Sequence, residues 1–218
     1  MIKAVIFDMD GVLVDSEPMH AKANVLALRE FGLDKPYEYY LGFAGNTKYD
    51  MMQTIIDDYN LDTTAEILVE TADKYNEIIY NEEGYTEING VINLIHKLYN
   101  KGLLLAVASS SPYKDIESVL NYFKIYDCFK VILSGTDETI EPKPAPDIYN
   151  KALTLLNVAP TEAVAFEDTS VGIKSAKTCG IYCIAYANPN SGKQDYSLAD
   201  RIIYNFDNVD EKTFIFTA

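Results

Sequence analysis

Four short stretches of the chain place polar side chains directly beside apolar runs or prolines. The residues concerned are Asp8 and Asp10, Ser109 to Ser111, Lys143 between two prolines, and Glu167 with Asp168. Each stretch alone is typical of a helix cap, a turn or a solvated loop. Open parallel sheets, however, bind ligands outside the carboxyl ends of their strands, and all four stretches fall at that edge of one predicted sheet. We therefore treat them as one candidate site.

The combination of acids, hydroxyls and an ammonium group predicts phosphate chemistry at a metal ion. Clustered carboxylates repel one another unless a cation lies between them. Oxygen ligands without a neighbouring His or Cys select a hard ion, and Mg²⁺ typically takes one or two carboxylates together with substrate phosphate. We expect a Mg²⁺ cofactor and a phosphate ester as the substrate.

Each polar group then has its own task. Asp8 can act as the nucleophile, because a carboxylate nucleophile divides one hard displacement into two easier ones. Asp10 would protonate the leaving oxygen and then deprotonate the attacking water. Ser109 and Lys143 would hold the transferring phosphoryl oxygens, and Lys143 would also offset negative charge. A glycine beside the acids lets the backbone pass close to the ligand. The further residues that we assign to substrate binding are Gly11 and Ser110.

The strands that must position these groups are visible as short apolar runs. They cover residues 2–7, 103–108, 131–133, 163–166 and 181–185. Helical periods of apolar residues separate the later runs, around residues 91–98, 116–123, 148–155 and 170–180. Strands that are continuously apolar and alternate with helices indicate a parallel sheet covered on both faces. The predicted class is α/β, with a Rossmann-like core.

One long stretch interrupts this alternation. Between the first strand and the helix that begins near Gly90, the chain shows helical periods but no convincing strand. A crossover between neighbouring parallel strands needs only about a dozen residues, far fewer than this stretch has. We predict that residues 15–85 form an inserted helical cap domain over the carboxyl end of the first strand. Residues 1–14 and 86–218 would form the core domain.

Composition excludes several classes of partner. The 218 residues include 18 basic and 33 acidic side chains, a net charge of −15, which makes nucleic acid or an anionic membrane a poor partner. No apolar run approaches the roughly 20 residues needed to span a bilayer. An acid at position 8 precedes any hydrophobic signal segment, and the three cysteines match no disulfide framework or zinc site. We expect a cytoplasmic monomer.

The ordered set of motifs resembles the haloacid dehalogenase superfamily, in particular its branch of small phosphatases and β-phosphoglucomutases with a helical cap. The first motif is Phe7-Asp8-Met9-Asp10-Gly11-Val12-Leu13-Val14-Asp15-Ser16-Glu17-Pro18; the others are Ala108-Ser109, Lys143-Pro144-Ala145-Pro146-Asp147 and Phe166-Glu167-Asp168-Thr169-Ser170-Val171-Gly172. The resemblance covers essentially the whole chain, and it implies a small phosphorylated metabolite, in particular a sugar phosphate, as the substrate. It implies Asp8 as nucleophile and metal ligand, Asp10 as acid/base and a ligand through its main-chain carbonyl, and Asp168 as a ligand. Glu167 would lie near the metal shell.

Within that family, hydrolysis and mutase chemistry remain alternatives. A mutase must grip the distal phosphate of a sugar bisphosphate with cations in its cap. In the β-phosphoglucomutase pattern these are a lysine and an arginine, for which this chain has Ala44 and Lys48. One cation is missing and the other lacks a bidentate fork, which favours hydrolysis. His20 matches a histidine of the mutase pattern that related phosphatases share, so a direct role and a purely local hydrogen bond both stay open.

A different class of protein also gathers acids, a hydroxyl and a lysine at one sheet edge. This is the non-enzymatic phosphoacceptor domain of the receiver type. Receivers place the acceptor Asp after a later strand and carry no large insert after the first. Here the Asp8 motif follows the first strand and a long insert is present, which favours an enzyme over a receiver.

Overall fold

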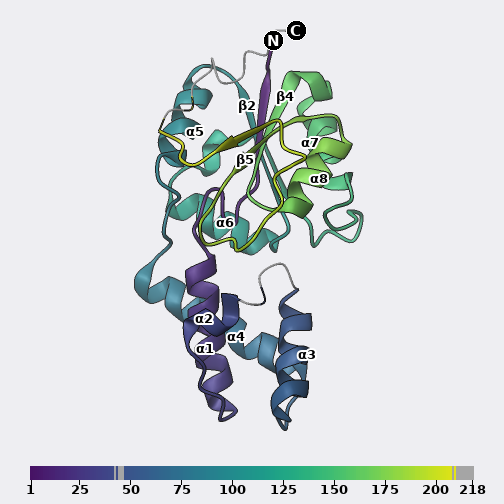
Figure 1. Ribbon diagram of the computed structural model, residues 1–218. Helices are drawn as coiled ribbons and strands as arrows, with labels where there is room; N and C mark the ends of the chain where they lie inside the picture. The colour runs from purple at the N-terminus through teal and green to yellow at the C-terminus, as the bar shows by residue number, and fades with distance from the viewer. Residues whose placement is uncertain (42, 44–46, 208, 210–218) are drawn as a thin grey trace. The chain divides into compact units, whose positions relative to one another are not determined.

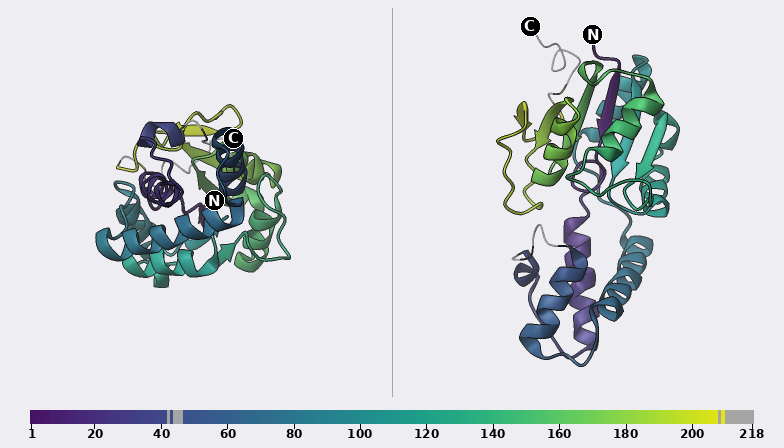
Figure 2. Two further views of the ribbon diagram at one scale, coloured as in Figure 1. Left: turned by 90° about the horizontal axis from the view of Figure 1, so that it is seen from below. Right: turned by 90° about the vertical axis from the view of Figure 1, so that its right-hand side faces the viewer.

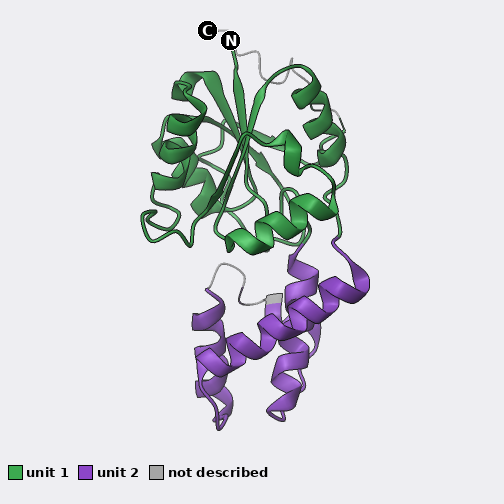
Figure 3. Cartoon of the chain, turned by 180° about the vertical axis from the view of Figure 1, so that it is seen from behind, with its two compact units in different colours: residues 1–15, 86–218 green, residues 16–85 purple. Residues whose placement is uncertain are grey.

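The computed structural model describes residues 1–41, 43, 47–207 and 209. The chain divides into two compact units (Figure 3). Unit 1 comprises Met1–Asp15 and Thr86–Ala218, and unit 2 comprises Ser16–Tyr85. The insert boundaries expected from the sequence, residues 15 and 85, differ from these by at most one residue. That the insert works as a cap stays a prediction.

Unit 1 contains the predicted parallel sheet. Among the described residues, six strands lie in the order β3-β2-β1-β4-β5-β6, all parallel to their neighbours. Their bounds are β1 Ala4–Phe7, β2 Leu104–Ser109, β3 Val131–Ser134, β4 Ala163–Glu167, β5 Tyr182–Tyr186 and β6 Arg201–Ile203. The α/β prediction is confirmed. Strand β6 was not predicted, because it is only three residues long and exposes two of them.

The register of the strands brings their carboxyl ends together. Phe7, the last residue of β1, pairs with Val107 of β2 on one side and with Phe166 of β4 on the other. Strand β1 is therefore central, and the residues that follow it lie between the ends of β2 and β4. Parallel pairing puts all these ends at one edge of the sheet.

Helices cover both faces of the sheet (Figure 1). Their bounds are α5 Val91–Asn100, α6 Tyr113–Tyr122, α7 Asp147–Leu156 and α8 Ser170–Thr178, with short 3₁₀ turns η1 Tyr126–Cys128 and η2 Pro160–Glu162. On one face, α7 packs on β2 and β3, and α8 packs on β4 and β5. The strand residues beneath these two helices are mostly alanines and buried. Small side chains allow the helices to approach the sheet closely.

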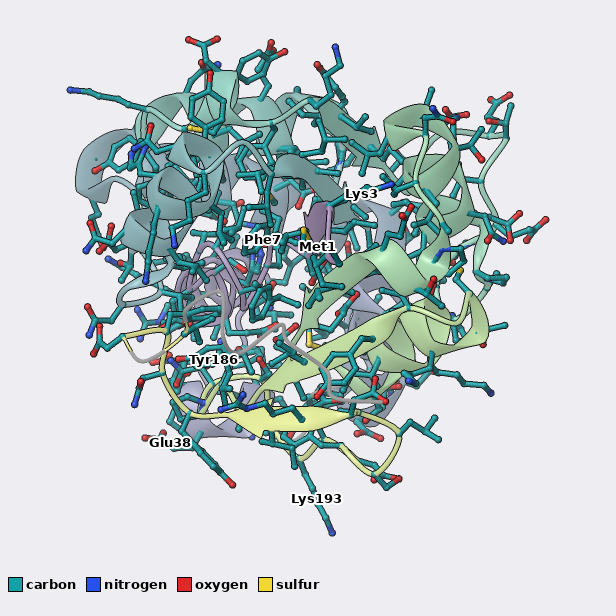
Figure 4. All side chains as sticks on the ribbon, turned by 90° about the horizontal axis from the view of Figure 1, so that it is seen from above. Met1, Lys3, Phe7, Glu38, Tyr186 and Lys193 are labelled. Carbon is teal, nitrogen blue, oxygen red and sulfur yellow. The ribbon has the colours of Figure 1, made fainter. Side chains whose placement is uncertain are left out.

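The other face of the sheet carries large side chains. Phe7 and Phe166 stack with their ring centroids 5.2 Å apart, and Phe129 and Phe206 contact them at 6.2 and 5.4 Å. Phe7 lies in the interior among the side chains drawn in Figure 4. Helix α5 packs on β2 and α6 on β3. Burial on both faces explains why the strands read as continuous apolar runs rather than alternating ones.

Unit 2 is helical (Figure 2). It contains α1 Glu17–Glu30, α2 Tyr37–Leu41, α3 Lys48–Tyr59 and α4 Ala65–Glu83. Helix α1 packs along α4, and α3 packs on α4 as well. The buried side chains between them include Leu28, Met52, Ile55 and Leu68. The side-chain oxygens of Thr47 and Thr64 accept hydrogen bonds from the first turns of α3 and α4, which explains where these two helices begin. In the described part of the chain, no helix is long and apolar enough to cross a membrane.

Candidate functional site

Three acids from two strand ends form the centre of the site. Asp8 directly follows β1, while Glu167 ends β4 and Asp168 follows it. One ligand oxygen of each lies within 4.8 Å of the others, and all three residues are buried. The backbone N–H of Asp8 donates to the carbonyl of Phe166 at 3.0 Å, which continues the strand pairing up to the site.

Two of these carboxylates carry an oxygen that accepts no hydrogen bond. They are Oε2 of Glu167 and Oδ1 of Asp168, and both atoms are buried. A buried carboxylate oxygen without a donor is costly unless a cation or water satisfies it. The donor set consists of oxygens alone, which is the set that Mg²⁺ prefers. The residues present therefore fit a hard divalent cation.

Lys143 is the buried cation of this cluster. It stands in the loop before α7, where the bond to Pro144 is cis, and its side chain is only 6% exposed. Its Nζ donates to Oδ1 of Asp8 at 2.9 Å, to Oε1 of Glu167 at 2.6 Å and to the carbonyl of Ala108 at 2.9 Å. One ammonium thus uses three donors to tie the ends of β1, β2 and β4 together.

The charges of the site act on one another. Burial, followed by the charge of Glu167, raises the pKa of Asp8 to about 7, although Lys143 acts in the opposite direction. Burial and the charge of Asp8 raise the pKa of Asp168 well above its ordinary range. Burial by itself lowers the pKa of Lys143, but Asp8 and Glu167 outweigh it and leave that pKa above its usual value. One ammonium does not compensate the acids fully.

Asp10 lies beside this cluster and makes a contact of its own. The Ser111 hydroxyl donates to Oδ2 of Asp10 at 2.5 Å. Ser109, at the end of β2, is buried, and its Oγ accepts a hydrogen bond from the backbone N–H of Ser111 at 3.0 Å. Ser110 is exposed at the same strand end. The three serines and Asp10 therefore lie together at the carboxyl end of the sheet, as expected from the spacing.

Gly11 and Gly172 are required by the acids rather than by turns alone. A Cβ on Gly11, whose φ is +73°, would lie 2.0 Å from Oδ2 of Asp168. A Cβ on Gly172 would lie 2.0 Å from Oε2 of Glu167. The Gly11 backbone thus lies against a carboxylate of the site, while its close approach to a ligand and its part in substrate binding stay predictions.

Two residues at the site were missed from the sequence. The hydroxyl of Tyr149, fully buried on α7, donates to Oε1 of Glu167 at 2.6 Å. The hydroxyl of Ser191, in the loop after β5, donates to Oδ2 of Asp168. Tyr149 falls on the apolar face of its helix, so its position in the sequence indicates a core residue. Ser191 follows the carboxyl end of a predicted strand, and that position was the available signal.

The two predicted binding residues of the insert both have partners within unit 2. Nδ1 of His20 lies 3.2 Å from Oδ1 of Asn76, and its ring contacts Tyr80 edge to face. Lys48 begins α3, and its Nζ forms an ion pair with Asp73 at 2.5 Å. Ala44, on which the comparison with the mutase pattern partly depends, lies outside the described residues. Substrate binding by His20 and Lys48 stays a prediction.

The chain is similar to known hydrolases and phosphatases. The family model for haloacid dehalogenase-like hydrolases matches residues 5–186. A phosphorylated carbohydrates phosphatase of Thermotoga maritima is 30% identical over 182 residues, 83% of this chain and 82% of that protein. A validoxylamine A 7′-phosphate phosphatase of Streptomyces hygroscopicus subsp. limoneus is 29% identical over 184 residues, 84% of this chain and 85% of the relative.

Solved structures of similar proteins match this chain as well. CbbY from Rhodobacter sphaeroides, in complex with phosphate, matches with a TM-score of 0.81 and 27% identity over 95% of this chain and 96% of that one. A putative β-phosphoglucomutase from Thermotoga maritima matches with a TM-score of 0.79 and 25% identity, over 93% and 94% of the two chains. The similarity thus spans both units of the chain.

Removing the Tyr149 hydroxyl tests whether it holds Glu167. In Tyr149→Phe the Glu167 carboxylate keeps Lys143 but loses a buried, charge-assisted donor. We expect the free energy of unfolding to fall by about 2 kcal/mol in urea denaturation. The control Tyr99→Phe, at a side chain that is 48% exposed, should change it by less than about 0.5 kcal/mol. Equal small effects of the two variants would contradict this contact.

The raised pKa of Asp8 predicts how stability depends on pH and Mg²⁺. Because the folded-state pKa of about 7 lies above the ordinary 3.8, the folded chain without a cation binds this proton more tightly than the unfolded chain. The contribution of Asp8 to stability therefore falls as pH rises from about 4 to about 7. Mg²⁺ should raise the melting temperature more at about pH 8 than at about pH 5. A pH-independent rise, measured by calorimetry with EDTA as the control, would contradict the expectation.

Proposed function

The chain belongs to the haloacid dehalogenase-like hydrolase family, and we propose that it is a Mg²⁺-dependent phosphatase. Its substrate would be a small phosphorylated metabolite, and Asp8 would carry the phosphoryl group as an aspartyl phosphate. The observation that carries this proposal is the buried group of Asp8, Glu167 and Asp168 around Lys143, in which two carboxylate oxygens lack a donor. Such a group is suited to a cation and a phosphate ester.

In the first step Asp8 attacks phosphorus. Lys143 binds Oδ1 of Asp8, which fixes the plane of the carboxylate and leaves Oδ2 to form the new bond. As the phosphorus–oxygen ester bond breaks, the leaving oxygen takes a proton from Asp10. The hydroxyl of Ser111 holds the Asp10 carboxyl in place for this transfer.

In the second step water attacks the phosphorus of the aspartyl phosphate. Asp10, now ionised, accepts a proton from that water, the bond between phosphorus and Asp8 breaks, and inorganic phosphate leaves. Asp10 thus returns to its protonated form and Asp8 to its carboxylate. Ser109 and Lys143 would donate to the phosphoryl oxygens in both steps, with Ser110 and the backbone at Gly11 as further contacts.

The cation would be held by Asp8, Asp168 and the main-chain carbonyl of Asp10, with Glu167 beside it. When bound, Mg²⁺ supplies positive charge to the phosphoryl oxygens and offsets repulsion among the carboxylates. Lys143 would supply a second positive charge beside Asp8. The ion pairs of Lys143 with Asp8 and Glu167 hold this ammonium beside the nucleophile. To donate to a phosphoryl oxygen, Lys143 would release one of its three present acceptors, Asp8, Glu167 or the carbonyl of Ala108.

A phosphorylated sugar is the substrate class that we propose. Support comes from the relatives, one of which is named a phosphorylated carbohydrates phosphatase. A CbbY variant from Rhodobacter sphaeroides has been solved in complex with xylulose-(1,5)bisphosphate, which supports a sugar phosphate as the substrate here. Residues 15–85 would form the cap that excludes water from the site, with His20 and Lys48 as its polar contacts to the substrate. We also propose that the enzyme works as a cytoplasmic monomer.

The ion pair between Lys48 and Asp73 favours hydrolysis over sugar transfer. The ammonium of Lys48 is already paired with Asp73, which offsets the charge that would otherwise grip a distal phosphate. A lysine also lacks the bidentate geometry of an arginine on phosphate. The chain thus provides weak support for holding a bisphosphate by both ends. A mutase reaction is the second candidate.

Asp8→Asn tests the nucleophile. The amide nitrogen and oxygen cannot form a stable phosphoryl adduct, so turnover of any substrate should fall by about a thousandfold or more. The variant should keep the far-UV circular dichroism of the parent protein. Glu138→Gln removes one charge at an exposed position of the same unit and should leave turnover unchanged. If Asp8→Asn kept even a few percent of the activity, Asp8 would not be the nucleophile.

A panel of sugar and short-chain phosphates with Mg²⁺ tests the reaction type. We expect phosphate release to exceed isomer formation for each ester, including β-glucose 1-phosphate. In water labelled with ¹⁸O, the released phosphate should contain oxygen from the solvent. Predominant conversion of β-glucose 1-phosphate to the 6-isomer would contradict hydrolysis and favour the mutase. Stable phosphorylation of Asp8 without turnover of any ester would favour a phosphoacceptor.

A further inference from the structure

The loop between β5 and β6, residues 187–200, forms three hydrogen bonds with the segments that follow β1 and β4, one of them to an acid of the site. Nδ2 of Asn188 donates to the carbonyl of Gly11 at 3.0 Å, and the hydroxyl of Ser191 donates to Oδ2 of Asp168. Nδ2 of Asn190 donates to Oδ2 of Asp15 at 2.7 Å. These contacts join the loop to the segments that follow β1 and β4, far away in the sequence.

Ser191 is itself held in place. Ser191 is only 6% exposed. The carbonyl of Ser191 accepts a hydrogen bond from Nε2 of Gln194 at 2.7 Å, and Oε1 of that side chain accepts from the backbone N–H of Ser170 at 2.9 Å. Ser170 begins α8, two residues after Asp168. In contrast, Lys193 of the same loop extends away from the molecule (Figure 4).

The hydrogen bond from Ser191 makes the two oxygens of Asp168 different. Oδ2 accepts from Ser191, while Oδ1 is buried and accepts no hydrogen bond. The backbone of Gly11 closes the site on the same side, because a Cβ there would lie 2.0 Å from Oδ2 of Asp168 and 3.1 Å from the Ser191 hydroxyl. The carboxylate can therefore turn little, and Oδ1 remains for a cation.

We propose that Ser191 is a positioning residue that sets the affinity of the site for its divalent cation. It acts through Asp168: by binding Oδ2, it fixes the carboxylate in the orientation that a bound ion needs, so that binding does not have to order this side chain. The inference rests on the proposed function, since it assumes that Asp168 is a metal ligand. It adds a loop residue to the set that determines metal binding.

Four variants test this role. Ser191→Ala removes the donor, and Ser191→Thr keeps a hydroxyl at the same position. Ser175→Ala is the matched control, since Ser175 is also buried in unit 1 but donates to the carbonyl of Ala145 instead of to an acid. Asp168→Asn tests the assumed ligand. Binding is measured without substrate, by titrating Mn²⁺ and following the free ion by electron paramagnetic resonance, with Mg²⁺ as competitor.

We expect Ser191→Ala to weaken Mn²⁺ and Mg²⁺ binding by about tenfold or more, the range typical of such supporting contacts. Ser191→Thr should restore most of the affinity. Ser175→Ala should lower the melting temperature and leave the affinity at that of the parent protein. If Ser191→Ala does not fold, Gln194→Ala takes its place, since it loosens Ser191 without removing the hydroxyl and should weaken binding in the same direction.

The outcomes separate this inference from the proposed function. Unchanged or tighter binding by Ser191→Ala, or an equal loss in Ser175→Ala, would overturn the role of Ser191 while Asp168→Asn still loses the ion. If the parent protein binds neither ion, or if Asp168→Asn binds as the parent does, the proposed metal site fails and the inference fails with it.

Discussion

Three buried carboxylates beside one buried ammonium are the constraint on which the rest of this structure depends. If Asp8, Glu167 and Asp168 are all ionised, Lys143 compensates only one of three charges. Burying unpaired charge is unfavourable by several kcal/mol per ion, so the folded chain must take up protons or a cation. The raised pKa of Asp8 and Asp168 expresses this imbalance. A buried cluster of three acids and one lysine adds little to stability. Its arrangement is suited to binding a divalent ion and a phosphate group.

The fold meets this constraint by fixing each carboxylate with donors from a different element. Strand register brings Asp8 and Glu167 to neighbouring strand ends. Lys143, from the loop before α7, joins both acids, and Tyr149 of α7 adds a second donor to the same oxygen of Glu167. Each donor binds one oxygen of its carboxylate, which leaves Oε2 of Glu167 without one. The site is thus built by orienting acids rather than by neutralising them, which is a requirement of preorganised electrostatic catalysis.

The sequence predicted most of the core and less of its surroundings. Five strands were visible because burial on both faces makes them continuous apolar runs, and the acids were visible because they end those runs. Strand β6 was not predicted, since it has three residues and exposes two of them. Helix α3 lies inside the predicted helical insert but was not singled out, although Met51, Met52, Ile55 and Ile56 form a buried face on it. Tyr149 and Ser191 were not predicted as site residues for another reason. Their roles arise from contacts across 18 and 23 residues of chain that only tertiary packing creates. No sequence pattern marks the tyrosine, and the position of Ser191 after a predicted strand does not distinguish it from the other polar residues of that loop.

A crystal structure of the protein grown with Mg²⁺ and beryllium fluoride, which imitates a phosphoryl group on a carboxylate, would test the shared cation and the nucleophile together. We expect a trifluoroberyllate bonded to Asp8, within hydrogen-bond distance of Lys143 and Ser109. We also expect a single Mg²⁺ bound by Asp8, Asp168 and the carbonyl of Asp10. An ion held elsewhere, or a beryllofluoride on any carboxylate other than Asp8, would contradict the central claim that these acids share one cation around a nucleophilic Asp8.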